Sequence, residues 1–160
     1  MAIDWQKVRY MVHRRTIFCS AAVLENDEIR QFPIGSLSIG PEGFSTYFEM
    51  FARPVQEGQT ITFMAVDTSP FFWLMSLLKG HFLHPPAIRL TGVIGPTHQG
   101  TSEEVSRFRR RIGLLLKTPG GQKLWGFSTA TSREVHFTKA SVVKLGSMTR
   151  GLENWLEVDP

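Results

Sequence analysis

Four segments with the pattern of β-strands follow one another between Thr16 and Val66, and only short turns separate them. Residues 17–24 are apolar over most of their length and predict a mostly buried strand. Residues 25–28 are turn formers, and residues 29–39 predict the returning strand. Strands with such short connections pair with their neighbours in the chain, which predicts an antiparallel meander that tends to close into a barrel.

The third of these strands is predicted from the alternation of its side chains between the two faces of a sheet. After the turn at residues 40–43, the side chains point in opposite directions with the period of two that is typical of a sheet, so that Phe48 and Met50 face one way and Glu49 the other. A polar loop then separates this strand from the fourth, at residues 60–66.

An apolar helix is predicted next. Thr68 or Ser69 can cap its start, Pro70 suits its first turn, and Gly80 suits its end. The residues between them, 71–78, are apolar nearly all round. Such a helix has to be covered, either by the barrel or by another subunit.

The rest of the chain completes a mainly β architecture with two or three flanking helices. Residues 87–95 predict a fifth strand, and Thr101 with Glu104 forms a capping box that opens a second helix. Residues 118–121 (Thr-Pro-Gly-Gly) are expected to end that helix, and a closing strand pair is expected at residues 134–137 and 141–145. We expect one domain over residues 1–160 with a core at about 15–148, and less firmly held ends.

Composition and charge limit the cellular compartment and the classes of binding partner that we expect. Cys19 is the single cysteine, which excludes a disulfide framework and favours a reducing compartment, the cytoplasm. The start of the chain has no secretory signal, and the apolar stretch at residues 70–78 is too short to span a bilayer, so no membrane partner is expected. A net charge of +4 favours an anionic partner: a phosphate ester, a nucleic acid or an acidic protein.

The order of elements resembles that of the pyridoxamine 5′-phosphate oxidase-like FMN-binding split barrels, over roughly residues 16–148. In the oxidases an Arg opens a strand that ends in Lys, a Gly-Phe hairpin leads to a Tyr-Thr-Asn strand end, and a Ser-Arg-Lys loop follows. The corresponding segments here are Arg30-Gln-Phe-Pro-Ile-Gly35, Gly43-Phe-Ser-Thr-Tyr-Phe48 and Ala52-Arg53-Pro54. The resemblance implies an antiparallel, Greek-key-like split β-barrel, FMN as cofactor and a homodimer with residues 71–78 in its interface.

The resemblance also implies a set of cofactor-binding residues, with the flavin phosphate on the two arginines. Gly35 and Pro54 stand where the oxidases have lysines, and each lost charge-assisted hydrogen bond is worth about 1.5–3 kcal/mol. Backbone N–H groups of residues 50–52 can form an anion nest in their place. The residues expected to bind the cofactor are Arg30, Phe48, Glu49, Met50, Arg53 and Trp125.

Three functions stay open from the sequence. The first is a flavin-dependent oxidoreductase of unknown substrate, in which the flavin carries the hydride and no catalytic residue is assigned. The second is a non-catalytic module that binds a flavin, a deazaflavin or haem. The third, the least favoured, is a nucleic-acid-binding β-barrel that uses the arginine-rich helix at residues 107–111.

Two other groups of residues are expected to carry no chemistry. His81-x-x-His84 lacks the third and fourth ligands that a zinc site needs, so no metal is expected. Cys19 lies in a predicted buried strand without a neighbouring positive group and is expected to be unreactive.

Overall fold

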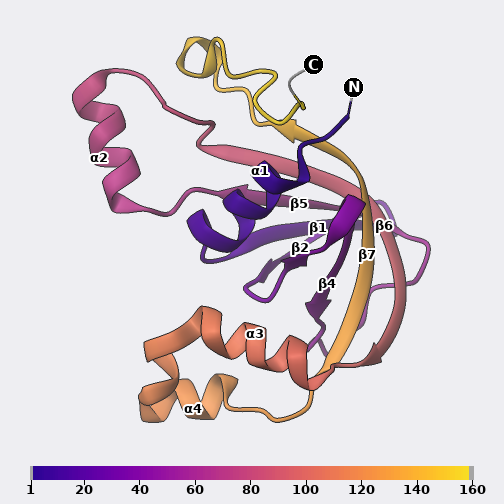
Figure 1. Cartoon of the computed structure of the whole chain (residues 1–160). Helices are drawn as coiled ribbons and strands as arrows, with labels where there is room; N and C mark the ends of the chain where they lie inside the picture. The colour runs from indigo at the N-terminus through magenta and orange to yellow at the C-terminus, as the bar shows by residue number, and fades with distance from the viewer. Residues whose placement is uncertain (1, 159–160) are drawn as a thin grey trace.

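A curled antiparallel sheet of seven strands dominates the computed structural model, which describes residues 2–158 (Figure 1). The strands pair in the order β2-β1-β5-β6-β7-β4-β3, so β2 and β3 form the two edges and the sheet curls without closing. The mainly β fold class is therefore confirmed. The strands are β1 Cys19–Glu25, β2 Glu28–Ile34, β3 Ser38–Ile39, β4 Phe44–Phe48, β5 Thr60–Val66, β6 Ala87–Gln99 and β7 Thr131–Val142.

The pairing of β4 differs from the predicted meander. The β1–β2 hairpin forms as expected, with Asn26 and Asp27 in the left-handed conformation that its tight turn requires. The predicted strand at residues 29–39 divides into β2 and β3, and β3 pairs with β4 across the predicted turn. However, the other neighbour of β4 is β7 rather than β5. The loop at residues 49–59 is long enough to carry the chain from β4 across to β5 on the far side of the sheet, so the prediction of a simple meander was wrong.

The closing pair of strands is also different from the prediction. Residues 131–142 form one continuous strand, β7, and β6 extends to Gln99 instead of ending at Gly95. Register shifts between Thr91 and Gly92 and between Ile94 and Thr97 let these two long strands bend while they stay paired. The bend wraps β6 and β7 around the core and gives the sheet its curl (Figure 1).

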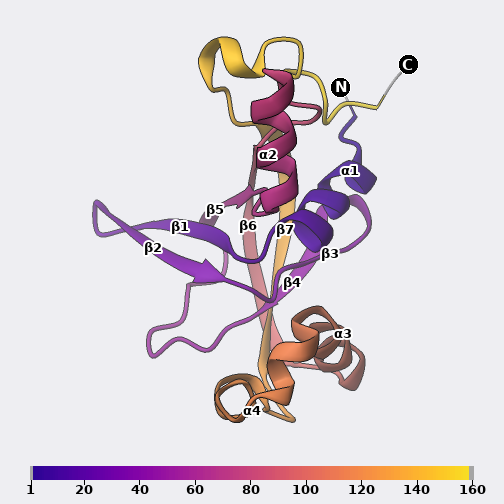
Figure 2. The same ribbon diagram turned by 90° about the vertical axis from the view of Figure 1, so that its left-hand side faces the viewer.

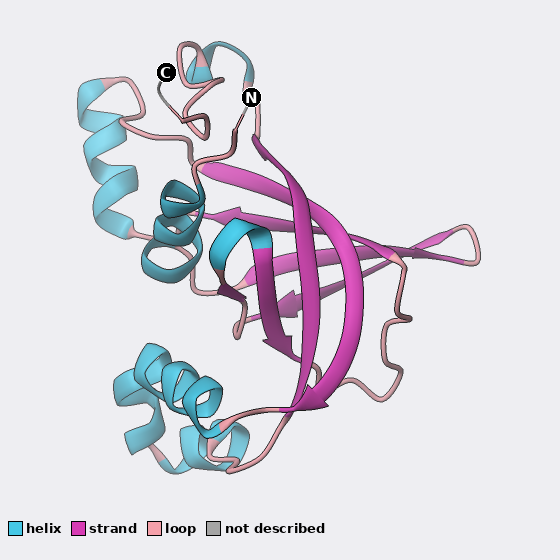
Figure 3. Cartoon of the chain, turned by 45° about the vertical axis from the view of Figure 1, so that its right-hand side comes forward, coloured by secondary structure: helices cyan, strands magenta, loops and turns pink. Residues whose placement is uncertain are grey.

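Four α-helices lie on the concave side of the β6–β7 pair, with α2 at one end of the molecule and α3 and α4 at the other (Figure 3). The helix caps that the sequence indicated are confirmed: Ser69 and Gly80 bound α2, and the capping box opens α3. The helices are α1 Trp5–Tyr10, extended by a π-helical turn at Met11–Arg15, α2 Pro70–Lys79, α3 Ser102–Ile112 and α4 Pro119–Trp125; short 3-10 turns occur at Pro41–Gly43, Gly113–Lys117 and Gly146–Thr149.

Helix α4 was not predicted. The Thr118–Gly121 segment was expected to end a helix, but the Thr118 side chain accepts a hydrogen bond from the Gly121 N–H and caps a new one. Proline in the first helical turn suits this start, because its missing N–H group has no partner to lose there. The α3–α4 pair therefore forms a small helical unit that lies beside the barrel (Figure 2).

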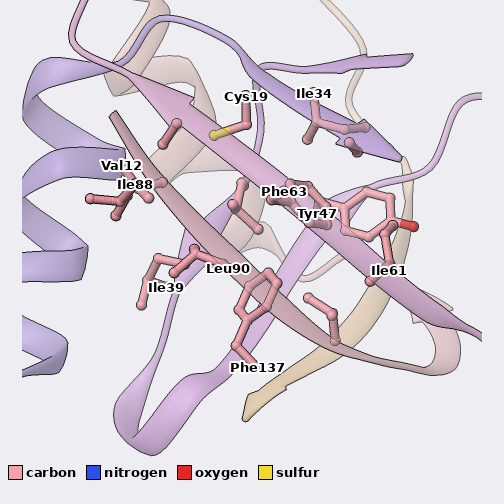
Figure 4. Packing of buried hydrophobic residues seen from close by; sticks show 14 of the residues in the cluster. Val12, Cys19, Ile34, Ile39, Tyr47, Ile61, Phe63, Ile88, Leu90 and Phe137 are labelled. Atoms are coloured by element: carbon pink, nitrogen blue, oxygen red, sulfur yellow. The ribbon is translucent and has the colours of Figure 1, made fainter. Parts of the chain in front are cut away.

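The buried core fills the inside of the curled sheet. Its aromatic rings meet edge to face, with the Tyr47 and Phe63 centroids 5.7 Å apart and the Phe63 and Phe137 centroids 5.4 Å apart (Figure 4). The core reaches further toward both ends of the chain than the sequence indicated, since Val8 and Leu156 are buried in it. A second, smaller cluster joins β4 to the α3–α4 pair, built on Phe48, Val105 and Phe108 with Trp125 and Phe127 against it.

Between residues 2 and 158, no helix is both long enough and apolar enough to cross a membrane.

Candidate functional site

A cleft of about 540 Å³ separates the open end of the barrel from the α3–α4 pair. It lies where the chain enters β1, where β2 and β4 end, and where α3 and α4 face the sheet. Most of its lining is apolar, and we call this part the apolar half. Its main lining residues are Ile17, Phe18, Phe48, Met50, Phe51, Leu115 and Trp125.

A second hollow of about 410 Å³ continues this cleft along α3. The two hollows share six lining residues, so we treat them as one cleft. The second part is lined by four arginines, and we call it the basic half. Its charged residues and histidine are His13, Arg14, Glu104, Arg107, Arg110 and Arg111.

Arg111 fastens α3 to the barrel. Its guanidinium donates to three backbone carbonyls, those of Leu37 at 2.7 Å, Val12 at 2.6 Å and Thr16 at 3.1 Å. No carboxylate among the described residues pairs with it, and burial lowers its pKa. Arg111 therefore places an uncompensated positive charge in the wall that both halves of the cleft share.

The other charges of the basic half leave it positive. Arg107 donates to Ser38 Oγ at 2.8 Å and pairs with Glu103, whereas Arg14 and Arg110 make no hydrogen bond or ion pair with any of residues 2–158. The one carboxylate in the lining, Glu104, accepts hydrogen bonds from the Thr101 N–H and from Ser132 and contacts His98. These contacts outweigh its burial and lower its pKa, so it is ionised but already satisfied.

The pKa of His13 is lowered by its burial and by the positive charges around the cleft. Its Nε2 accepts a hydrogen bond from the Ile39 N–H at 2.9 Å, which requires an unprotonated nitrogen. Burial, and then the charges of Arg111 and other nearby arginines, lowers the pKa of His13 to about 4. The imidazole is therefore neutral at pH 7, and the same field favours an anion in the cleft.

We expect an NMR titration of the His13 ring to give a pKa close to 4, well below the usual value of about 6.5. Since the folded-state pKa is lower than the unfolded one, the unfolded state binds more protons between these values. The free energy of unfolding should then fall as the pH drops from about 6.5 through about 4. His13→Gln, which keeps an acceptor for Ile39, should remove this part of the pH dependence; an unchanged slope would contradict the assignment.

The cleft brings together three of the six residues predicted to bind a cofactor. Phe48, Met50 and Trp125 all line the apolar half. Glu49 directly follows β4 and lines neither hollow; it is buried and pairs with Arg133 at 2.6 Å. Its carboxylate is thus engaged in the fold, away from the cleft.

The two predicted arginines come together outside the cleft lining. Arg30 Nη1 donates to the Arg53 carbonyl at 3.0 Å, and both guanidinium groups approach the Glu25 carboxylate, at 3.4 Å and 2.9 Å. Two positive charges share one negative charge, so this pair carries a net charge of +1. Among the described residues the buried Nε of Arg30 has no partner, and its Nη2 makes the 3.4 Å ion pair with Glu25 but no hydrogen bond.

An aromatic pair links these arginines to the apolar half. Phe51 lines the cleft and packs on Phe32, with ring centroids 4.5 Å apart, and the Arg30 guanidinium lies 5.4 Å from the Phe32 centroid. Arg53 follows Phe51 by two residues. The arginine pair therefore lies beside the apolar half, behind the Phe32 and Phe51 rings.

His13, Arg14 and Arg111 were not predicted as site residues. The arginines of residues 107–111 were predicted only as a candidate nucleic-acid-binding surface on a helix. The helical spacing of Phe108, Arg111 and Leu115 puts these three side chains on one face and could have indicated that Arg111 points into the same cleft as its apolar neighbours.

No protein-family model and no curated protein matches this chain. Solved structures do. An FMN-binding protein from Syntrophomonas wolfei shares 14% identity with a TM-score of 0.56, over 89% of this chain and 87% of that one. HupZ of Group A Streptococcus shares 10% identity with a TM-score of 0.54 (88% and 94% covered), and an F420 reductase shares 11% with a TM-score of 0.52 (82% and 94%). At these identities the likeness shows the fold, and the split barrel expected from the sequence is confirmed.

Proposed function

We propose that this split barrel binds a flavin-type cofactor, with FMN as the first candidate, in the apolar half of the cleft, and acts as an oxidoreductase on an anionic substrate. The observation that carries this proposal is the arrangement of the cleft: an aromatic-lined cavity that continues into an arginine-lined hollow, with the Arg30–Arg53 pair beside its lining. The S. wolfei protein and the F420 reductase, whose folds this chain shares, support a flavin or deazaflavin as the ligand class.

The apolar half has the size and lining that a flavin ring needs. Its volume of about 540 Å³ lies within the range of small-molecule sites, about 300–1,000 Å³. Aromatic and apolar side chains such as Phe48, Met50 and Trp125 can pack on the faces of a planar ring system. Trp125 belongs to α4, so the α3–α4 pair would hold the ring against β4.

The Arg30–Arg53 pair suits the phosphate of the cofactor. Arg30 Nε is buried without a partner among the described residues, and Nη2 is held only by the 3.4 Å ion pair with Glu25, so an anion at this point would recover free energy. Arg53 is the more exposed of the two, and its side chain can turn to a ligand without disturbing the core. A phosphate here would also relieve the excess positive charge around Glu25.

The basic half is then left for the substrate. Arg14 and Arg110 have no partner among the described residues, and Arg107 and Arg111 add further positive charge, so a carboxylate or phosphate group is favoured there. When bound, the flavin supplies the hydride chemistry. The chain's own residues position the substrate through its anionic group and exclude water from the ring.

Contacts within the fold weaken the nucleic-acid alternative. Of the four arginines on α3, Arg107 and Arg111 bond to the barrel, and Arg109 donates to the Phe127 carbonyl at 2.9 Å. Only Arg110 has no contact of this kind among the described residues. Three of these four charges are thus already used to hold α3 and α4 in place, which leaves little of the helix for a phosphate backbone.

The proposal is tested by absorbance spectra of concentrated protein before and after addition of FMN and removal of the excess. We expect retained flavin bands, and we expect Arg53→Ala to raise the dissociation constant for FMN about tenfold or more, because a charge-assisted contact is lost. Arg150→Ala, which also removes one exposed arginine, is the matched control and should bind as the parent does. A colourless protein from which FMN and a deazaflavin both wash away would overturn the proposal.

Arg110→Ala separates substrate binding from cofactor binding. We expect the variant to keep the flavin absorbance spectrum. We also expect inorganic phosphate, as a probe anion, to change the fluorescence of the bound flavin less in the variant than in the parent. If Arg110→Ala loses the flavin while Arg53→Ala keeps it, the cofactor phosphate lies in the basic half, and the two roles are exchanged.

A further inference from the structure

Helix α2 exposes a large apolar surface at one end of the molecule. Of its ten residues only Phe72 and Ser76 are buried. Leu77 is 79% exposed and Leu78 72% exposed, and Phe71 and Leu74 are also exposed. At 3.6 residues per turn these four lie within about a third of the helix circumference and form one apolar face. Figures 1 and 2 show α2 standing away from the sheet, at the opposite end from α3 and α4.

The helix is held in this position by specific contacts. Trp73 Nε1 donates to the Asp67 carbonyl at 2.7 Å, and Ser69 caps the first turn. On the buried side the Phe72 ring stacks on His84, with centroids 4.3 Å apart, and His84 Nε2 lies 3.3 Å from the buried carboxylate of Asp67. The fold therefore presents the apolar face outward instead of letting it collapse onto the barrel.

Two segments beside this face carry positive charges and no carboxylate. Residues 68–86 contain no Asp or Glu and carry Lys79 near the end of α2. The segment at residues 143–152, which lies at the same end of the molecule, also lacks acidic residues and adds Lys144 and Arg150, both exposed (Figures 1 and 2). It contributes the exposed apolar side chain of Met148 as well. Glu153 is the first carboxylate to follow in the chain.

We infer that this end of the molecule docks on an anionic lipid surface, with α2 lying in the interface between head groups and acyl chains. A convex, protruding helix with Phe, Trp and Leu on its outer face and cations beside it is the form that interfacial membrane binding takes. The lysines and Arg150 would meet the negatively charged head groups while the leucines enter the acyl region. This mode of binding does not require a transmembrane helix, which needs about 20 residues. Helix α2 has ten residues, enough to lie in the interface.

Charge favours a lipid surface over a second copy of the chain. In a symmetric dimer through α2 the same patch occurs on both sides, so both copies bring their cations, Lys79, Lys144 and Arg150, to the rim of one interface. Like charges placed opposite each other oppose association. An anionic membrane complements the charge and the apolar face at once.

The test is co-sedimentation of the protein with vesicles of phosphatidylcholine alone and of phosphatidylcholine mixed with phosphatidylglycerol. We expect association with the mixed vesicles and weak association with the neutral ones, and a decrease as salt is added. Leu77→Glu should weaken association about tenfold or more, because it puts a charge in the acyl region. Replacing Lys79 and Lys144 by glutamine should weaken it about fivefold for each cation.

Leu114→Glu is the matched control. Leu114 is 74% exposed and lies at the end of the molecule that carries α3 and α4. Its replacement by glutamate should therefore leave vesicle association unchanged. Circular dichroism and the unfolding temperature verify that both glutamate variants fold. Light scattering measures the oligomeric state in the same samples. Absence of association with the mixed vesicles, equal association with both vesicle types, or a dimer that Leu77→Glu dissociates would each overturn the inference.

Discussion

Replacing Glu49 by leucine is expected to lower the free energy of unfolding by about 3–5 kcal/mol, because it leaves a buried arginine without its counter-charge. The carboxylate and the Arg133 guanidinium are 2.6 Å apart, with 3% and 8% of their side-chain surfaces exposed. The other carboxylate oxygen accepts the Val55 N–H, and Arg133 donates to the Val55 carbonyl. One ion pair therefore fastens the loop after β4 to β7.

The double variant Glu49→Leu/Arg133→Met distinguishes an isolated charge from a loss of packing. If the single variant is unstable because Arg133 is left unpaired, removing Arg133 as well should restore a large part of the lost stability. Urea unfolding of the parent, both single variants and the double variant measures this. If the double variant loses as much free energy of unfolding as the two single variants together, the two residues act independently.

Replacing Arg111 by methionine is expected to cost about 3 kcal/mol, since three carbonyl groups lose a charged donor. The aliphatic part of the side chain is kept, so the change isolates the guanidinium contacts to Val12, Leu37 and Thr16. Because the Arg111 charge is one cause of the low pKa of His13, that pKa should rise toward its usual value in the variant.

Arg110→Met is the control for this experiment. It removes the same charge from the neighbouring position on α3, where no side-chain hydrogen bond or ion pair with a described residue is lost, so stability should change by less than about 0.5 kcal/mol. Thermal or urea unfolding gives the stabilities, and the NMR titration gives the pKa of His13. Equal losses of stability in the two variants would contradict the role of Arg111 in fastening α3.

The parts of the fold that depend on local signals could be predicted from the sequence. The strand at residues 60–66 was placed correctly because a polar loop precedes it and its apolar residues alternate. The ends of α2 and the start of α3 were also correct, since Ser69, Gly80 and Thr101 are capping residues whose hydrogen bonds reach only a few positions along the chain. The strand patterns supplied the mainly β class, and the resemblance supplied the split barrel.

The parts that depend on long-range contacts could not be predicted. Glu49 and Arg133 are 84 positions apart, and neither is marked as the partner of the other. Arg111 is harder still, because it bonds to backbone carbonyls up to 99 positions away, and such acceptors are the same in every residue. The same limit explains the pairing of β4: nothing local to residues 44–48 says that they will meet β7.

The position of β7 also determines when this protein can finish folding. It pairs with β6 on one side and with β4 on the other, so it joins the four-stranded part of the sheet to the β3–β4 hairpin. A chain being synthesised reaches residues 131–142 after every other strand of the sheet has left the ribosome. Until then two strand edges stay unpaired, and such edges are where unfinished chains aggregate. Completion of the sheet therefore waits for its last strand, and unfinished chains should depend on chaperones for that interval.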